Sequence, residues 1–191
     1  MSTLRVDNLN ARTGTTITVP SGTTLYAPGS IIQVVNTYLN SPQSQSVSGS
    51  WTTYNDISGF AATITPKSTS SKIYATVRWF GEFGSTDGGY NAMFGLKRNT
   101  SVIGLGSVAN LYGLHTSALS YTYSDNDSTP DVCFFDYYDS PASTSSLTYQ
   151  VYICLSSSQT LYTNRVVSSS SASSPSYERG TSSITLFEIA G

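Results

Sequence analysis

Apolar and polar side chains alternate without a break from Leu147 to Leu155. The odd-numbered positions carry Leu, Tyr, Val, Ile and Leu, whereas the even-numbered positions carry Thr, Gln, Tyr and Cys. An extended chain places alternate side chains on opposite faces, so this period of two predicts a strand with one face in a core. A helix would instead spread the apolar side chains around its whole circumference.

Shorter runs of the same kind recur along the chain, each bounded by Ser, Thr, Asn, Gly or Pro. The number and spacing of these runs predict an all-β protein built as a β-sandwich, of which the jelly roll is the commonest form at this size. We expect strands at residues 31–35, 51–65, 73–79, 92–96, 102–103, 132–134, 147–155, 161–167 and 184–189. We expect loops or turns at residues 40–50, 67–72, 82–91, 97–101, 125–130 and 168–176, where polar residues and glycine gather.

Residues 1–29 differ from the rest because they hold only short, weakly apolar runs, each with one thin apolar edge. Hairpins of this size are marginal in water, so the edges need cover. They could dock onto the same chain's main domain, or three copies could wrap around a common axis. We favour wrapping, which predicts a homotrimer with an intertwined stem at residues 1–29 and a jelly-roll-like head at residues 30–191. The expected stem contacts are Leu4, Val6, Leu9, Ile17, Val19 and Leu25.

The composition narrows the function classes. Only 10% of the residues are charged and the net charge is −2, while aromatic residues reach 12%. Nine basic residues against eleven acidic ones argue against a nucleic-acid surface. No apolar run approaches the ~18 residues that a membrane helix needs. The first residues lack the apolar segment of a secretory signal, which predicts synthesis in a cytoplasm.

Few residues could bind a metal. Cys133 and Cys154, with the single histidine His115, make a zinc site improbable, and we expect two buried free thiols rather than a disulfide. A second set of residues resembles a calcium loop in its spacing, but Pro130 stands where that loop needs glycine. An EF-hand is therefore excluded, and a looser calcium site or a solvated turn both stay open. The residues at the ligand spacing are Asp125, Asp127, Thr129, Asp131 and Asp136.

No pattern typical of an enzyme stands out. His115 has no Gly-x-Ser-x-Gly nucleophile elbow to accompany it, so we expect a loop position or a satisfied core histidine. A glycosidase needs a pair of carboxylates, for which Asp136 and Asp139 with Glu82 or Glu178 are the candidates. We expect these acids to be surface charges, and we therefore predict no catalytic residue and no cofactor.

Tyrosine is unusually frequent, with 14 copies. We expect most of the tyrosines to pack within the head or between subunits, where the ring is buried and the hydroxyl stays wet. Tyrosines in loops can instead bind glycans and proteins with little loss of entropy. The aromatic residues in predicted loops, and thus the candidates for receptor contact, are Phe83, Tyr90, Tyr112 and Tyr177.

Several sequence pieces together resemble a β-rich module at the ends of tail fibres in tailed bacteriophages, notably marine cyanobacterial phages. The resemblance implies a virion protein, a homotrimer with a β-rich head on a short β-prism stem, and no catalytic residues. The pieces are PGSIIQVV (residues 28–35), ITPKSTSSKI (64–73), DSP (139–141), YQV (149–151), NR (164–165) and GTSSITLFEI (180–189). The opening LRVDN (4–8) resembles the short β repeats that precede this module.

These observations predict a non-enzymatic phage virion protein, a trimeric fibre or adhesin that binds a glycan or protein of the host cell surface. Residues 1–29 would contact other virion proteins of the tail or capsid. We expect neither nucleic-acid binding nor membrane insertion. A second hypothesis is a capsid decoration or head-fibre protein, anchored to the particle by its N-terminus, whose head binds nothing. A carbohydrate-active enzyme is disfavoured because no deep cleft with converging acids is indicated.

Overall fold

The computed structural model describes residue 14 and residues 27–84, 91–107, 109–116, 128–169 and 178–191. Strands make up 59% of this part of the chain, which contains no helix, so the all-β prediction is confirmed. Accordingly, no helix of the described residues could span a membrane. All six predicted stem contacts lie outside the described residues, so the stem stays a prediction.

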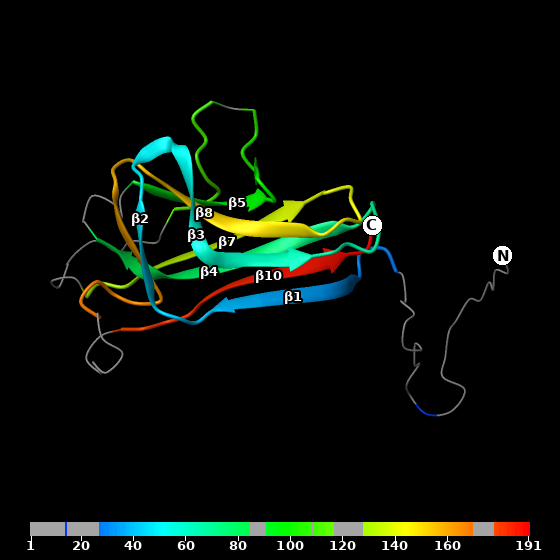
Figure 1. Cartoon of the computed structure of the whole chain (residues 1–191). Helices are drawn as coiled ribbons and strands as arrows, with labels where there is room; N and C mark the ends of the chain where they lie inside the picture. Colours follow the sequence, from blue (N-terminus) through cyan, green and yellow to red (C-terminus); the bar gives the residue numbers. More distant parts are fainter. Residues whose placement is uncertain (1–13, 15–26, 85–90, 108, 117–127, 170–177) are drawn as a thin grey trace.

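Ten strands form two stacked antiparallel sheets (Figure 1). The four-stranded sheet has the order β3-β8-β5-β6, and the six-stranded sheet has the order β1-β10-β4-β9-β2 with β7 also paired to β4. The first sheet consists of β3 (Ser50–Ile64), β8 (Leu147–Leu155), β5 (Ala92–Arg98) and β6 (Ser101–Ile103). The second consists of β1 (Ile31–Leu39), β10 (Ser182–Ile189), β4 (Lys72–Phe83), β9 (Gln159–Thr163), β2 (Gln43–Val47) and β7 (Asp131–Asp139).

Strands far apart in sequence pair with one another in a nested pattern. β1 pairs with β10, β2 with β9, β3 with β8, β4 with β7 and β5 with β6. The two ends of this arrangement are tied together, because the Gly29 amide donates to the Ala190 carbonyl at 2.7 Å and the Ala190 amide donates to Ser30 at 2.9 Å. The residues just before β1 and just after β10 therefore lie side by side.

The core lies between the sheets and follows the alternation of apolar residues. β8 has the predicted bounds, and all its odd-numbered side chains are buried. Trp79 of β4 is fully buried facing them, with its ring centroid 5.0 Å from that of Phe94 and its indole N–H donating to Thr163 at 3.0 Å. That hydrogen bond satisfies the only polar group of the largest core side chain.

The even-numbered side of β8 is buried in part as well. Tyr152 and Cys154 are fully buried, because the Tyr152 ring lies over Gly95 of the neighbouring strand. A Cβ atom at Gly95 would stand 2.4 Å from that ring, so only glycine leaves room for it. One end of the four-stranded sheet is therefore covered on both faces.

Two predicted loops contain strand residues. Residues 40–50 include β2, which forms despite its polar side chains because its backbone pairs with β9. The loop predicted at residues 82–91 starts later, since β4 continues to Phe83. Gly81 interrupts the apolar run but keeps the period of two, which is why the strand's end was misplaced. The hairpin turn between β5 and β6 is confirmed, with Asn99 at a φ of 55°.

The core assignment predicts the cost of trimming one β8 side chain. Ile153→Ala should lower the free energy of unfolding by about 2–5 kcal/mol, because Ile153 is fully buried and the lost volume leaves a cavity. Thr148→Ala on the half-buried side of the same strand should cost well under half as much. Urea denaturation of both variants checks this, and equal losses would contradict the assigned faces.

Candidate functional site

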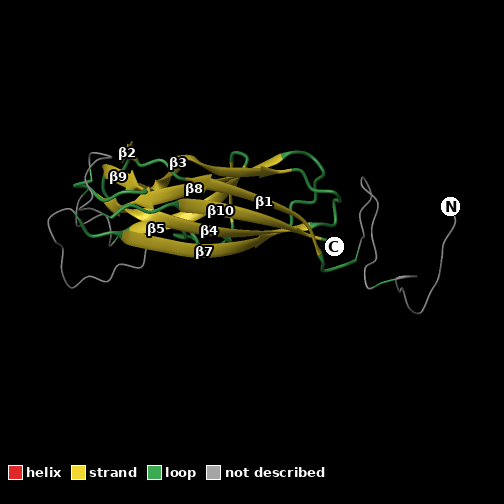
Figure 2. Ribbon diagram, turned by 90° about the horizontal axis from the view of Figure 1, so that it is seen from below, coloured by secondary structure: helices red, strands yellow, loops and turns green. Residues whose placement is uncertain are grey.

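The outward side of the six-stranded sheet forms an extended surface over β1, β10, β4 and β7. Figure 2 shows these strands side by side. Their registers align the outward side chains in three rows, which we call the outer face. The rows are Val34, Phe187, Tyr74 and Tyr138; then Asn36, Thr185, Thr76 and Asp136; then Tyr38, Ser183, Arg78 and Phe134.

The outer face is unusually apolar for a surface. Tyr38 is 64% exposed, Phe134 57%, Val34 55% and Tyr138 52%. These four, with Ile31 at the end of β1, are five of the six large apolar side chains that stand exposed in the described chain. The outward side of an antiparallel sheet is normally polar, and several large apolar side chains exposed on one sheet face are typical of a surface that another molecule covers.

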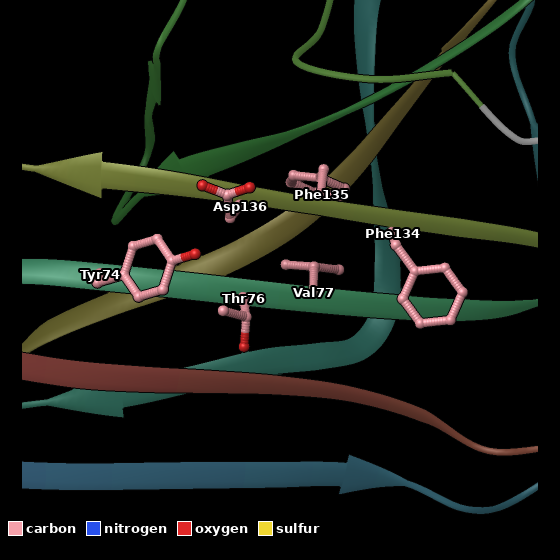
Figure 3. A pocket seen from close by; sticks show the side chains of 6 residues that line it. All are labelled: Tyr74, Thr76, Val77, Phe134, Phe135 and Asp136. Atoms are coloured by element: carbon pink, nitrogen blue, oxygen red, sulfur yellow. The ribbon is translucent and has the colours of Figure 1, made fainter.

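A shallow, open hollow lies on this face between β4 and β7. In Figure 3, Tyr74 stands at one end of it and Phe134 at the other, with Asp136 and Thr76 opposite each other between them. The hollow is too open to exclude water from a reaction, but it can receive a protruding side chain or a ring.

Two opposite charges stand on the outer face without an ionic partner in the described residues. Asp136 is exposed on β7, and Arg78 on β4 donates from Nη2 to the Thr181 hydroxyl at 3.0 Å. The Nε of Arg78 is buried and makes no hydrogen bond. The other ten side chains of the three rows are uncharged.

A second surface lies on the outward side of the four-stranded sheet. Trp51 stacks on Tyr112 with ring centroids 5.0 Å apart, and Tyr54 meets Tyr152 edge-on at 5.1 Å. The Tyr152 hydroxyl donates to the Tyr112 carbonyl at 3.2 Å, which joins the two pairs. We call these four residues the aromatic cluster. Its Trp51 and Tyr112 are half-buried, so the cluster offers rigid rings at the surface.

The four predicted contact residues have different outcomes. Tyr112 lies at the surface in the aromatic cluster, whereas Tyr90 and Tyr177 lie outside the described residues. The loop position predicted for Phe83 is wrong, because Phe83 is in β4, only 7% exposed, and packs on Trp79 at 5.5 Å. Trp51 was missed, although a tryptophan beside Gly49 and Ser50 at the start of a strand was a usable signal.

The buried acids that we considered for catalysis hold the fold together, contrary to the prediction that they are surface charges. Asp139 accepts two hydrogen bonds from Arg98, at 2.9 and 2.7 Å, and one from the Tyr149 hydroxyl at 2.7 Å. Burial, together with that bond to Asp139, raises the pKa of Tyr149. Glu82 accepts from the backbone amides of Thr129 and Val167.

The other two acids lie at the surface. Asp136 is exposed on the outer face, and exposed Glu178 accepts a hydrogen bond from Ser128 at 3.0 Å. His115 is exposed too, and its backbone bridges to Phe94 at the edge of β5. Among the described acids and His115, no pair converges on an open cleft.

Both cysteines are buried and free, as predicted. Burial, with the nearby Asp131, raises the pKa of Cys133 to about 12, and burial raises that of Cys154 to about 11. Within the described residues, no group of three or more His, Cys, Asp or Glu side chains could hold a metal ion. Asp125 and Asp127 lie outside those residues, so the calcium hypothesis stays a prediction.

Comparison with known proteins found no protein family and no curated protein that matches the chain. The outer face and the aromatic cluster are therefore the features from which a function is inferred.

The two ion pairs of the head predict different costs of losing a carboxylate. Asp139→Asn should lower the free energy of unfolding by about 2–4 kcal/mol, because it leaves Arg98 and Tyr149 without a buried charge partner. Asp56→Asn should cost less than about 1 kcal/mol, because the Asp56 carboxylate that pairs with Lys97 is 52% exposed and solvated. Thermal and urea unfolding of both variants tests the difference, and an unaffected Asp139→Asn protein would contradict it.

Proposed function

We propose that the chain is a non-enzymatic virion protein of the fibre or adhesin type, which assembles as a homotrimer and attaches to the host cell surface. The observation that carries the proposal is the outer face, whose first row is apolar or aromatic on all four strands and whose third row adds the exposed rings of Tyr38 and Phe134. The resemblance of most of residues 28–191 to a module at the ends of phage tail fibres supports this class of protein.

The outer face is suited to assembly because its exposed side chains are of the kinds that enrich protein interfaces. Five of its twelve side chains are Tyr or Phe, and Lys and Glu are absent from its three rows. A chain with only 10% charged residues also has little charge repulsion to oppose association. Contacts at this face add to those that we expect from the stem at residues 1–29.

The nested strand pairing supports a jelly-roll head. In a jelly roll, a long antiparallel ribbon is rolled so that the first strand pairs with the last and inner strands pair in turn. The pairs β1–β10, β2–β9, β3–β8, β4–β7 and β5–β6 follow that order.

The aromatic cluster supports the adhesive role. It lies on the sheet opposite the outer face, so assembly through the outer face leaves Trp51 and Tyr112 accessible. Their rings are held by stacking and by the Tyr112 hydroxyl, which donates to Asn110 at 3.0 Å. Three copies on one rigid body multiply a weak contact through effective concentration. The ligand class that we propose is a glycan or protein of the host surface.

Assembly through the outer face is tested with Val34→Glu. The intact wild-type chain should sediment as a trimer. Val34→Glu should raise the dissociation constant of the trimer roughly tenfold, because covering the outer face would bury an unpaired carboxylate. The matched control is Leu111→Glu, which changes an exposed leucine away from the outer face and should leave the trimer intact. A wild-type monomer would contradict the assembly.

The adhesive role is tested with Trp51→Ala. Binding of the labelled trimer to host cells, or to glycans on an array, should fall at least about tenfold, since an anchoring ring is lost. Trp51→Phe keeps a ring for stacking and should retain part of the binding. Thr53→Ala changes a neighbouring exposed residue and should leave it unchanged. Unaltered binding by folded Trp51→Ala would remove the cluster from the receptor contact.

A further inference from the structure

We propose that Arg78 of one copy forms an ion pair with Asp136 of a second copy where two outer faces meet. The inference rests on the proposed assembly, and it names the pair of charges that sets the alignment of the copies. It commits the outer face to one occupant, another copy of this chain.

The positions of the two residues support this pairing. Thr76 stands opposite Asp136 and Arg78 stands opposite Phe134, so the two charges lie on adjacent strands and one row apart. Asp136 lines the hollow from β7, the outermost of the four strands, and Arg78 stands beside Phe134 at the end of the hollow. They are the only charged side chains in the three rows.

Neither charge is neutralised within the described chain. The Arg78 guanidinium bonds to the neutral hydroxyl of Thr181, and its buried Nε has no acceptor. Asp136 makes no hydrogen bond or ion pair there either, in contrast to Asp139 on the same strand, which binds Arg98 and Tyr149. An exposed charge tolerates this state because water solvates it. A charge covered by an apolar partner surface does not.

A second copy of the chain meets the requirement of both charges at once. Covering the outer face with an uncharged partner would bury a cation and an anion without compensation, at a cost in binding. In a symmetric assembly every copy carries both charges, so one alignment of the copies sets the cation of one copy against the anion of the next. Around a threefold axis each interface then holds one such pair, and about a twofold axis each interface holds two. In either case the charges fix the register of the apolar rows.

Charge reversal tests the pairing in the full-length chain. Arg78→Asp and Asp136→Arg should each raise the dissociation constant of the oligomer at least about tenfold, because each brings like charges together at the interface. The double reversal should return to within about threefold of the wild type. The control is a charge on the other sheet, Asp56, whose side chain is 52% exposed; Asp56→Lys should leave assembly unchanged. Analytical ultracentrifugation measures the constants, and circular dichroism confirms that each variant is folded.

Mixing the two single variants separates a pair between copies from a pair within one chain. Equal amounts of Arg78→Asp and Asp136→Arg should associate more tightly than either alone, since only mixed contacts bring opposite charges together. A pair formed within one chain cannot be rescued in this way. Wild-type assembly with unaffected single variants, or with no gain on mixing, would overturn this inference and leave the proposed function standing. A monomeric wild type would overturn both.

Discussion

The head depends on the burial of one face of each sheet against the other. Trp79 and the odd-numbered side chains of β8 meet in that layer. A shift of either strand by one residue would move its buried apolar side chains to the solvent face, so their burial fixes which side chains point inward. An antiparallel sheet whose inner face is packed on a core normally carries polar side chains on its outer face, which water solvates. The six-stranded sheet departs from this arrangement, because its outer side carries Phe134, Tyr38 and Val34. Stability of the single chain does not require these exposed residues, and the proposed assembly through the outer face would account for them.

Sequence alternation predicted the strands that face the core and failed where other forces act. β8 was placed correctly because its burial imposes a period of two on the side chains. β2 was missed because it has almost no apolar content and is held by backbone pairing with β9. Phe83 was misplaced because Gly81 contributes no side chain to the pattern. The alternation of apolar side chains therefore predicts strands with a buried face. It does not predict strands, such as β2, whose side chains are polar.

The candidate site could be predicted only in part, for a different reason. Tyr112 was identified from its residue type and its loop, but its stacking on Trp51 joins residues far apart in the sequence. The outer face has the same origin, since its rows follow from the registers of four strands. Register is a property of the sheet as a whole and is not encoded in any one strand. Asp139 also shows this, because its partner Arg98 comes from the opposite sheet.

The pairing of β1 with β10 has a consequence for how the protein is made. The ribosome releases β1 well before its hydrogen-bonding neighbour β10, as the bond between Asn36 and Thr185 across 149 positions illustrates. The nascent head must keep the apolar residues of β1 from mispairing during that delay. Closure of such distant contacts is intrinsically slow. A chain cut before β10 would lack the partner of β1 and would leave that strand with an open edge.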